Sequence, residues 1–169
     1  ADMVATMHGF DRSTLDTYAL RSQQLAAAAR RAGYFAPSLV PVKDANGLTI
    51  LDNDEYIREE TTVASLAALK PAFGGSAAAA NYLVAQQRYP ELAKVTPVHT
   101  AGNSSGIVDG ASLVLVGSER IGTELGLRPR ARILGTGLSS VDPTLMLVGP
   151  PPATRQALAK AGLAVEQID

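Results

Sequence analysis

The sequence predicts a layered α/β fold on the strength of three observations. Residues 11–31 have the spacing of a long amphipathic helix. Residues 111–116 form a near-continuous apolar run, which is typical of a strand in a sheet covered on both faces. From residue 97 onward, strand-like and helix-like segments alternate. A chain of 169 residues can bury a sizeable core in one large domain or two small ones.

The composition excludes several functional classes. The chain contains no cysteine, so disulfides, zinc-thiolate sites and a cysteine nucleophile cannot arise within it. Fifteen Lys and Arg against 16 Asp and Glu, with 5% aromatic residues, argue against nucleic acid as a partner. No apolar run approaches the roughly 18 to 20 residues that span a bilayer, and no signal peptide is recognisable. We therefore expect a soluble, cytoplasmic protein without a membrane partner.

The first strong element in the chain is the helix at residues 11–31. Asp11 can cap its free backbone N–H groups, and Gly33 supplies a left-handed stop. Basic residues on its polar side are offset by nearby acids, which favours a solvated face over a nucleic-acid surface. The predicted inward-facing residues are Leu15, Tyr18, Ala19, Leu25, Ala26 and Ala29.

A hairpin is expected next. Two short apolar runs, residues 39–42 and 48–51, flank Asn46-Gly47, which is a strong turn signal, and Pro41 marks an edge strand. The acidic stretch 52–60 lacks the ligand spacing of a calcium-binding EF-hand loop, so we interpret it as a polar connector and expect no metal site.

Two further helices are predicted before the glycine-rich part of the chain. Residues 61–69 form the first, capped by Thr61 or Thr62 and ended by Lys70-Pro71. Residues 76–87 form the second, which is rich in alanine and lies between Gly74-Gly75 and Pro90.

The last third of the chain has the alternating pattern. A short extended run, Val98 to Thr100, leads into a glycine-rich turn at residues 101–110 and then into the apolar strand. The elements predicted after it are a helix from Ser118 to Gly126, a strand at 131–136, and a helix from Pro150 to Gly162.

The glycine-rich turn is the best candidate for chemistry. Its glycines, Asn and Ser residues allow close backbone approach to a ligand and offer hydrogen-bond donors, although a tight turn that only packs a strand against a helix is the alternative. The spacing matches neither a dinucleotide-binding fingerprint nor a P-loop. Ser105 lies near His99 but lacks the Gly-x-Ser-x-Gly elbow of hydrolases, so a serine hydrolase is not expected.

These residues carry a resemblance to a known family. Residues 99–111, HTAGNSSGIVDGA, resemble the T-A-G-N-x-S-G-x-x-D-G-A block of thiolases, the acyltransferases that cleave 3-ketoacyl-CoA or condense two acetyl-CoA. Collinear matches extend over almost the whole chain. They include the helix with Asp16 and Gln23, residues 54–58, 69–73 and 125–133, Asp142-Pro143 and Gly149-Pro150.

The resemblance implies part of a thiolase-like layered α-β-α fold, namely the end of the first βαβαβ half and the start of the second, with a helical insertion. Residues 1–73 would belong to the loop and helical insertion that covers CoA. Residues 74–128 would end the N-terminal half, and residues 129–169 would start the C-terminal half. The family's acyl-accepting cysteine would precede Ala1, and its Gly-His-Pro histidine and second cysteine would follow Asp169. No catalytic residue is therefore expected within these residues.

By position in the family motifs, five residues resemble CoA contacts. Arg58 and Ser65 would meet the adenine nucleotide end, Ala101 and Ser105 would meet the pantetheine amides, and Phe73 would wall the same slot. On the residues alone, Arg58 could instead pair with Glu55 or Glu59 on the surface, and Phe73 could belong to the core.

The resemblance also predicts the wider function. The chain would be a segment of a thiolase-type acyltransferase with CoA and acyl-CoA as substrates, no tightly bound cofactor, and a homodimeric or homotetrameric complete subunit. The alternative is a non-catalytic CoA-binding or scaffold protein of the same fold. Residues 74–96 are longer than the usual family link, and we expect this insertion to influence acyl-chain preference or a subunit contact.

Overall fold

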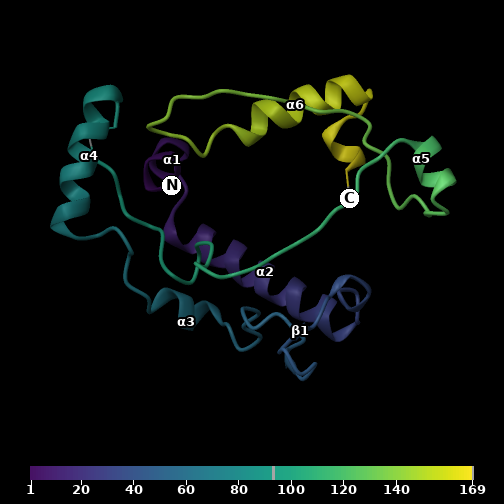
Figure 1. Ribbon diagram of the computed structural model, residues 1–169. Coiled ribbons are helices and arrows are strands. Elements are labelled where there is room, and N and C mark those ends of the chain that lie inside the picture. Colours follow the sequence, from purple (N-terminus) through teal and green to yellow (C-terminus); the bar gives the residue numbers. More distant parts are fainter. Residues whose placement is uncertain (93, 169) are drawn as a thin grey trace. The chain divides into compact units, whose positions relative to one another are not determined.

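The computed structural model describes residues 1–92 and 94–168, and Ala93 and Asp169 lie outside the described residues. The chain forms two compact units, residues 1–107 and residues 108–169 (Figure 1). None of the helices in the described stretches is long and apolar enough to cross a membrane. The first unit contains α1 (Asp2–His8), α2 (Arg12–Arg31), the 3-10 turn η1 (Ala36–Ser38), β1 (Val42–Lys43), β2 (Thr49–Leu51), α3 (Val63–Ala67) and α4 (Ser76–Arg88). The second contains α5 (Glu119–Glu124), α6 (Pro150–Ala161) and the 3-10 turn η2 (Val165–Gln167).

Helix α2 confirms the predicted long helix and its cap. The Asp11 side chain accepts a hydrogen bond from the Thr14 backbone N–H at 2.8 Å. Beyond the helix, Gly33 has a φ of 74°, a left-handed conformation that costs glycine little.

The predicted inward face of α2 is partly wrong. Tyr18 is 73% exposed and Leu25 is also exposed, whereas the buried positions are Asp16 and Ala27. Asp16 and Ala27 are about three turns apart and therefore share one face. This face is the buried one because α2 packs against α3 and the polar network around Asp16 described below.

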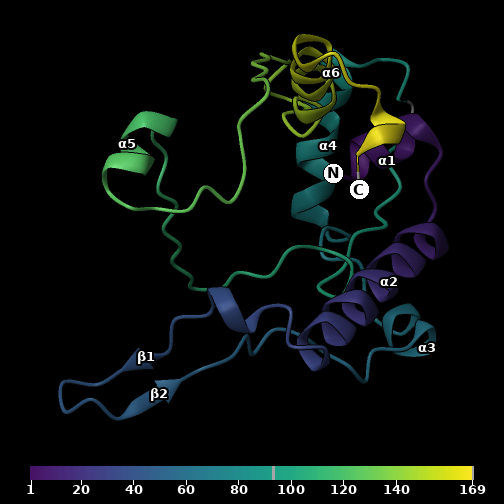
Figure 2. The same ribbon diagram turned by 90° about the vertical axis from the view of Figure 1, so that its right-hand side faces the viewer.

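The predicted hairpin is confirmed. Strands β1 and β2 pair antiparallel, with Val42 opposite Leu51 (Figure 2). Asn46-Gly47 forms the turn, in which Gly47 has a φ of 84° and the Asp44 carboxylate accepts from two backbone N–H groups that follow it. The acidic stretch after β2 contains neither helix nor strand, as a connector should.

The two helices predicted next in the chain are also confirmed, although the first, α3, is shorter than the predicted range 61–69. In α3 the Thr62 side chain accepts from the Ser65 N–H and the Ser65 hydroxyl accepts from the Thr62 N–H, a reciprocal capping box. Helix α4 covers the alanine-rich segment predicted to be helical. The described apolar residues that are buried in this unit are Met3, Ala5, Ala27, Leu66, Ala85, Leu92, Val95 and Val98.

Two strand predictions in the second unit are wrong. Residues 111–116 and 131–136 form no strand, and Leu113 is 97% exposed. A strand exists only through hydrogen bonds to a neighbour, and among the described residues the only paired strands are β1 and β2. The helix predictions hold, since Ser118 caps α5, Pro150 opens α6, and Gly162 ends it.

The close approach of residues 135–137 to α6 predicts a strongly destabilising substitution. A Cβ atom on Gly137 would overlap the Ala153 carbonyl oxygen, and one on Gly135 would lie 2.6 Å from the Ala157 carbonyl oxygen. Helix backbone cannot yield as a side chain can, so we expect Gly137→Ala to lower the free energy of unfolding by about 2 kcal/mol. Gly117→Ala is the matched control because its Cβ meets nothing within 4 Å. Urea denaturation of both variants checks the difference, and equal midpoints would contradict this packing.

Candidate functional site

A cleft with a volume of about 590 Å³ lies on the first unit. Helix α2, the connector after β2, helix α3 and the glycine-rich turn contribute its walls. The lining residues are Gln23, Arg30, Tyr56, Ile57, Arg58, Glu59, Glu60, Thr61, Ser65, Leu66, Leu69, Ala101, Gly102 and Ser104.

Three of the five residues assigned from the family motifs lie together in this cleft. Arg58, Ser65 and Ala101 line it, although they are far apart in the sequence. Ser105 is not among the lining residues, but its neighbour Ser104 is. Phe73 is also absent from the lining and is exposed in the segment after α3. The structure therefore brings together Arg58, Ser65 and Ala101, but not Ser105 or Phe73.

Arg58 is positioned by its neighbours rather than by a carboxylate. Its backbone N–H donates to the Gln23 side-chain oxygen at 2.8 Å, and its guanidinium carbon lies 5.1 Å from the centre of the Tyr56 ring. That separation suits a cation–π contact. The surface alternative, a pair with Glu55 or Glu59, is not among the ion pairs of the described residues.

Glu59 is engaged by two other arginines. Arg30 donates to one carboxylate oxygen at 2.8 Å, and Arg31 lies 3.2 Å from the other. The hydrogen bond from Arg30, followed by the charge of Arg31, holds the pKa of Glu59 below its ordinary value despite some desolvation. Glu59 thus stays ionised and paired with Arg30 and Arg31. It does not neutralise Arg58, whose charge can therefore act on a ligand in the cleft.

The Ser65 hydroxyl can accept one further hydrogen bond. Its hydroxyl donates to the Thr62 carbonyl oxygen at 2.9 Å and accepts from the Thr62 N–H at 3.0 Å. A hydroxyl has one donor and two acceptor positions, so one acceptor position is left. Ser65 can therefore accept a hydrogen bond from a ligand without releasing the helix cap.

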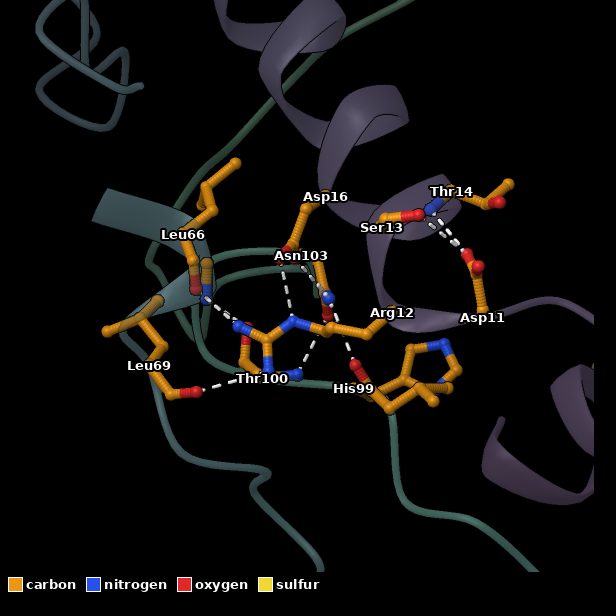
Figure 3. Close-up of polar contacts among 12 residues, drawn as sticks. Asp11, Arg12, Ser13, Thr14, Asp16, Leu66, Leu69, His99, Thr100 and Asn103 are labelled. Atoms are coloured by element: carbon orange, nitrogen blue, oxygen red, sulfur yellow. Dashed lines mark hydrogen bonds and ion pairs between the residues drawn. The ribbon is translucent and has the colours of Figure 1, made fainter. Parts of the chain in front are cut away.

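A buried polar network holds the glycine-rich turn against α2 and α3 (Figure 3). Asp16, only 2% exposed, accepts from Arg12 Nε at 2.8 Å and from the Asn103 amide at 2.9 Å. The Asn103 side-chain oxygen in turn accepts from the Thr100 N–H at 2.7 Å. The Arg12 guanidinium also donates to the carbonyl oxygens of Leu66 and Leu69. Three of the elements that line the cleft, namely α2, α3 and the glycine-rich turn, are thus tied to one ion pair.

A second buried carboxylate, Asp2 of α1, holds the segment just before the turn. It accepts from the backbone N–H groups of Val98 and His99 at 2.9 and 3.0 Å. The His99 ring nitrogen Nδ1 lies 2.6 Å from the same oxygen, and the Tyr82 hydroxyl of α4 donates to the other oxygen at 2.8 Å. Burial raises the pKa of Asp2, but these hydrogen bonds together outweigh it and hold the pKa below its ordinary value. Burial, then the bond to Asp2, raises the pKa of Tyr82.

The lowered pKa of Asp2 predicts acid sensitivity. A carboxyl group whose pKa is lower in the folded state stabilises the fold above its unfolded pKa of about 4, and this contribution is lost as the pH falls through the folded value. We expect Asp2→Asn to lower the thermal midpoint at pH 7, with the gap to the unsubstituted protein narrowing steadily below about pH 4. Thermal scans from pH 7 to pH 2.5 check this, and a gap that stays constant over that range would contradict it.

The polar network was not found from the sequence. Arg12 and Asp16 are four residues apart on one helix face, which is the spacing of an ion pair and the one available signal. Asn103 was assigned only to the turn, and nothing in the sequence marks Asp2 as a partner of residues almost a hundred positions away. Arg30 and Gln23 were likewise not assigned to the cleft.

Comparisons with known proteins show which family this chain resembles. Residues 1–84 match the sequence profile described as "Thiolase, N-terminal domain". The chain is 45% identical over its whole length to a 3-ketoacyl-CoA thiolase of Serratia proteamaculans, and 40% identical to a beta-ketoadipyl-CoA thiolase of Pseudomonas putida. It spans 40% and 38% of the length of these two relatives.

Solved structures agree with the sequence comparison. Human mitochondrial 3-ketoacyl-CoA thiolase in complex with CoA matches 99% of the chain with 36% identity and a TM-score of 0.80, and the chain covers 37% of that structure. Bacillus anthracis acetyl-CoA acetyltransferase matches 98% with 34% identity and a TM-score of 0.78, and the chain covers 37% of it. These similarities confirm a partial thiolase-like α/β fold. The chain therefore belongs to the thiolase family and corresponds to a segment of the relatives named here.

Proposed function

We propose that this chain is the CoA-holding segment of an acyl-CoA C-acyltransferase. The complete subunit would perform thiolysis of 3-ketoacyl-CoA or condensation of acetyl-CoA, as a homodimer or homotetramer in the cytoplasm. Three of the relatives named above are thiolases and one is an acetyl-CoA acetyltransferase, and one of the solved structures is a complex with CoA, which supports CoA as the ligand. The cleft that gathers Arg58, Ser65 and Ala101 is the observation that carries this proposal.

The nucleotide end of CoA would lie at Arg58 and Ser65. Arg58 provides a fixed planar cation already stacked on Tyr56, which suits a phosphorylated ligand with an aromatic base. The spare acceptor position of Ser65 suits an exocyclic amino group such as that of adenine. Arg30 lines the same cleft and adds positive charge there, although Glu59 shares it.

The pantetheine arm would lie along the glycine-rich turn. Its two amides need donors and acceptors in a narrow slot, and the turn offers backbone groups at Ala101 together with the Ser105 hydroxyl. Phe73 would form the apolar wall of this slot. Ser105 and Phe73 are not in the cleft lining, so their roles depend on the Ser105 end of the turn and on Phe73 closing on the bound arm while residues 98–103 stay in place.

The bond-making chemistry would be supplied from outside these residues. A cysteine thiolate would take the acyl group from CoA and pass it on, and the chain itself contains no cysteine. The role of this segment is then to bind and orient CoA. We propose that residues 1–73 cover the ligand, that residues 74–128 end the N-terminal half, and that residues 129–169 start the C-terminal half.

Binding and turnover measured side by side test the proposal. We expect the complete subunit to bind CoA and to cleave acetoacetyl-CoA, and residues 1–169 alone to show no turnover. Turnover by the isolated segment would overturn the assignment of catalysis to other residues. A complete subunit that binds CoA tightly without turnover would favour the non-catalytic scaffold alternative, and one that does not bind CoA would overturn the proposal.

A further inference from the structure

The buried Asp2 carboxylate joins three segments that are far apart in the sequence. It belongs to α1, its Oδ1 atom binds the start of the glycine-rich segment at residues 98–99, and its Oδ2 atom binds Tyr82 on α4. Asp2 is 3% exposed. A carboxylate removed from water in this way is costly unless its oxygens are well paired, so these bonds define one geometry for all three segments.

The segment that Asp2 holds is also tied to a second buried carboxylate, Asp16. Asn103 donates to Asp16 at 2.9 Å and to the Val98 carbonyl oxygen at 3.1 Å. In addition, the Ala72 N–H donates to the His99 carbonyl oxygen at 2.8 Å. Residues 98–103 are therefore fixed at one end by Asp2 and at the other, through Asn103, by Asp16. Ala101 and Gly102, which line the cleft, lie within this fixed stretch.

The Tyr82 contact gives residues 74–96 a role. Helix α4 lies within this stretch and supplies the hydroxyl that donates to Asp2. The same hydroxyl lies 3.5 Å from the Phe73 carbonyl oxygen, so it also reaches the segment that follows α3. Helix α4 is thus connected through the Asp2 carboxylate to the residues that lead into the turn.

We propose that Asp2, His99 and Tyr82 form a positioning cluster that sets the glycine-rich turn for CoA, and that residues 74–96 serve this cluster through Tyr82. This inference rests on the proposed function, because it assigns the purpose of the cluster to CoA binding. His99 completes the cluster by closing its ring nitrogen Nδ1 on Asp2 at 2.6 Å, and its side chain is largely buried. The three residues act through the turn and touch no reacting atom.

Three variants of the complete subunit test the cluster, with the dissociation constant and KM for CoA, kcat, and the thermal midpoint measured for each. Tyr82→Phe removes only the hydroxyl, and His99→Val removes the ring donor. We expect each to raise the dissociation constant and KM for CoA about fivefold, the equivalent of one hydrogen bond, while kcat changes less than about twofold. His99→Asn places an amide donor near the position of Nδ1 and should restore most of the affinity. Tyr34→Phe is the matched control, because Tyr34 is 77% exposed.

Hydrogen exchange separates this inference from the proposed function. In the absence of CoA, we expect the amides of residues 100–105 to exchange faster in His99→Val and Tyr82→Phe than in Tyr34→Phe. A lower thermal midpoint with unchanged KM and unchanged exchange would mean that the cluster is merely structural and would overturn the positioning role. Failure of His99→Asn to recover affinity would also count against it. An unsubstituted protein that does not bind CoA would instead overturn the proposed function.

Discussion

Replacement of Asp16 by alanine is expected to lower the free energy of unfolding by about 3 kcal/mol, the largest loss of stability predicted for this chain. The substitution would leave the Arg12 guanidinium without its carboxylate and the Asn103 amide without one acceptor, both in a largely buried setting. This loss of stability arises mainly because the two groups lose a hydrogen-bond partner while largely buried, rather than from the intrinsic strength of the Arg12–Asp16 pair. Because Asn103 fixes Thr100, CoA affinity should fall as well.

A double-mutant cycle checks the origin of that loss. In an Arg12→Met background the cation is gone, so Asp16→Ala should cost only about 1 kcal/mol. Asp52→Ala, which removes an exposed acid, is the control and should change stability by less than about 0.5 kcal/mol. Urea denaturation of the four members of the cycle and the control gives these values. An Asp16→Ala cost that is the same with and without Arg12 would contradict the network.

Replacement of Arg58 by alanine is expected to weaken CoA binding about tenfold or more. Charge-assisted hydrogen bonds to phosphate groups typically contribute about 1.5 to 3 kcal/mol, and Arg58 is the cleft cation that no carboxylate in the described residues neutralises. Arg58→Lys keeps the charge but loses the planar stacking on Tyr56, so its affinity should be intermediate.

Pantetheine distinguishes this role from a general loss of binding. It lacks the nucleotide end, so Arg58→Ala should leave its affinity unchanged while CoA affinity falls. Arg21→Ala, on the exposed side of α2, is the matched control and should bind both ligands normally. Isothermal titration with the two ligands makes the comparison. If Arg58→Ala lowers the affinity for pantetheine as much as the affinity for CoA, Arg58 does not contact the nucleotide end.

Local signals in the sequence predicted most of the helices and the hairpin. Asp11, Thr62 and Ser118 each accept the backbone hydrogen bond that their residue type favours at a helix start, and Asn46-Gly47 turns the hairpin. Interactions of this kind involve residues three or four positions apart, so the sequence contains all the necessary information. The predictions of strands at 111–116 and 131–136 were wrong for the opposite reason. A strand depends on a hydrogen-bonded partner that its own residues do not specify.

The candidate site was likewise predicted only in part from the sequence. The family motifs led to Arg58, Ser65 and Ala101, which line one cleft. The residues that hold the cleft in shape, Asp2 and Asp16, were not found, since the residues in and just before the turn that they bind lie more than eighty positions away. Such long-range polar contacts depend on tertiary packing, and a single sequence carries no pattern that pairs them.

The structure of the complete subunit with CoA bound tests the central claim most directly. We predict that the adenine nucleotide end lies against Arg58 and Ser65 and that the pantetheine arm follows Ala101 and Ser105, with residues 98–103 held by Asp2 and Asp16 as they are in its absence. CoA bound elsewhere on the subunit, with this cleft left empty, would contradict the account.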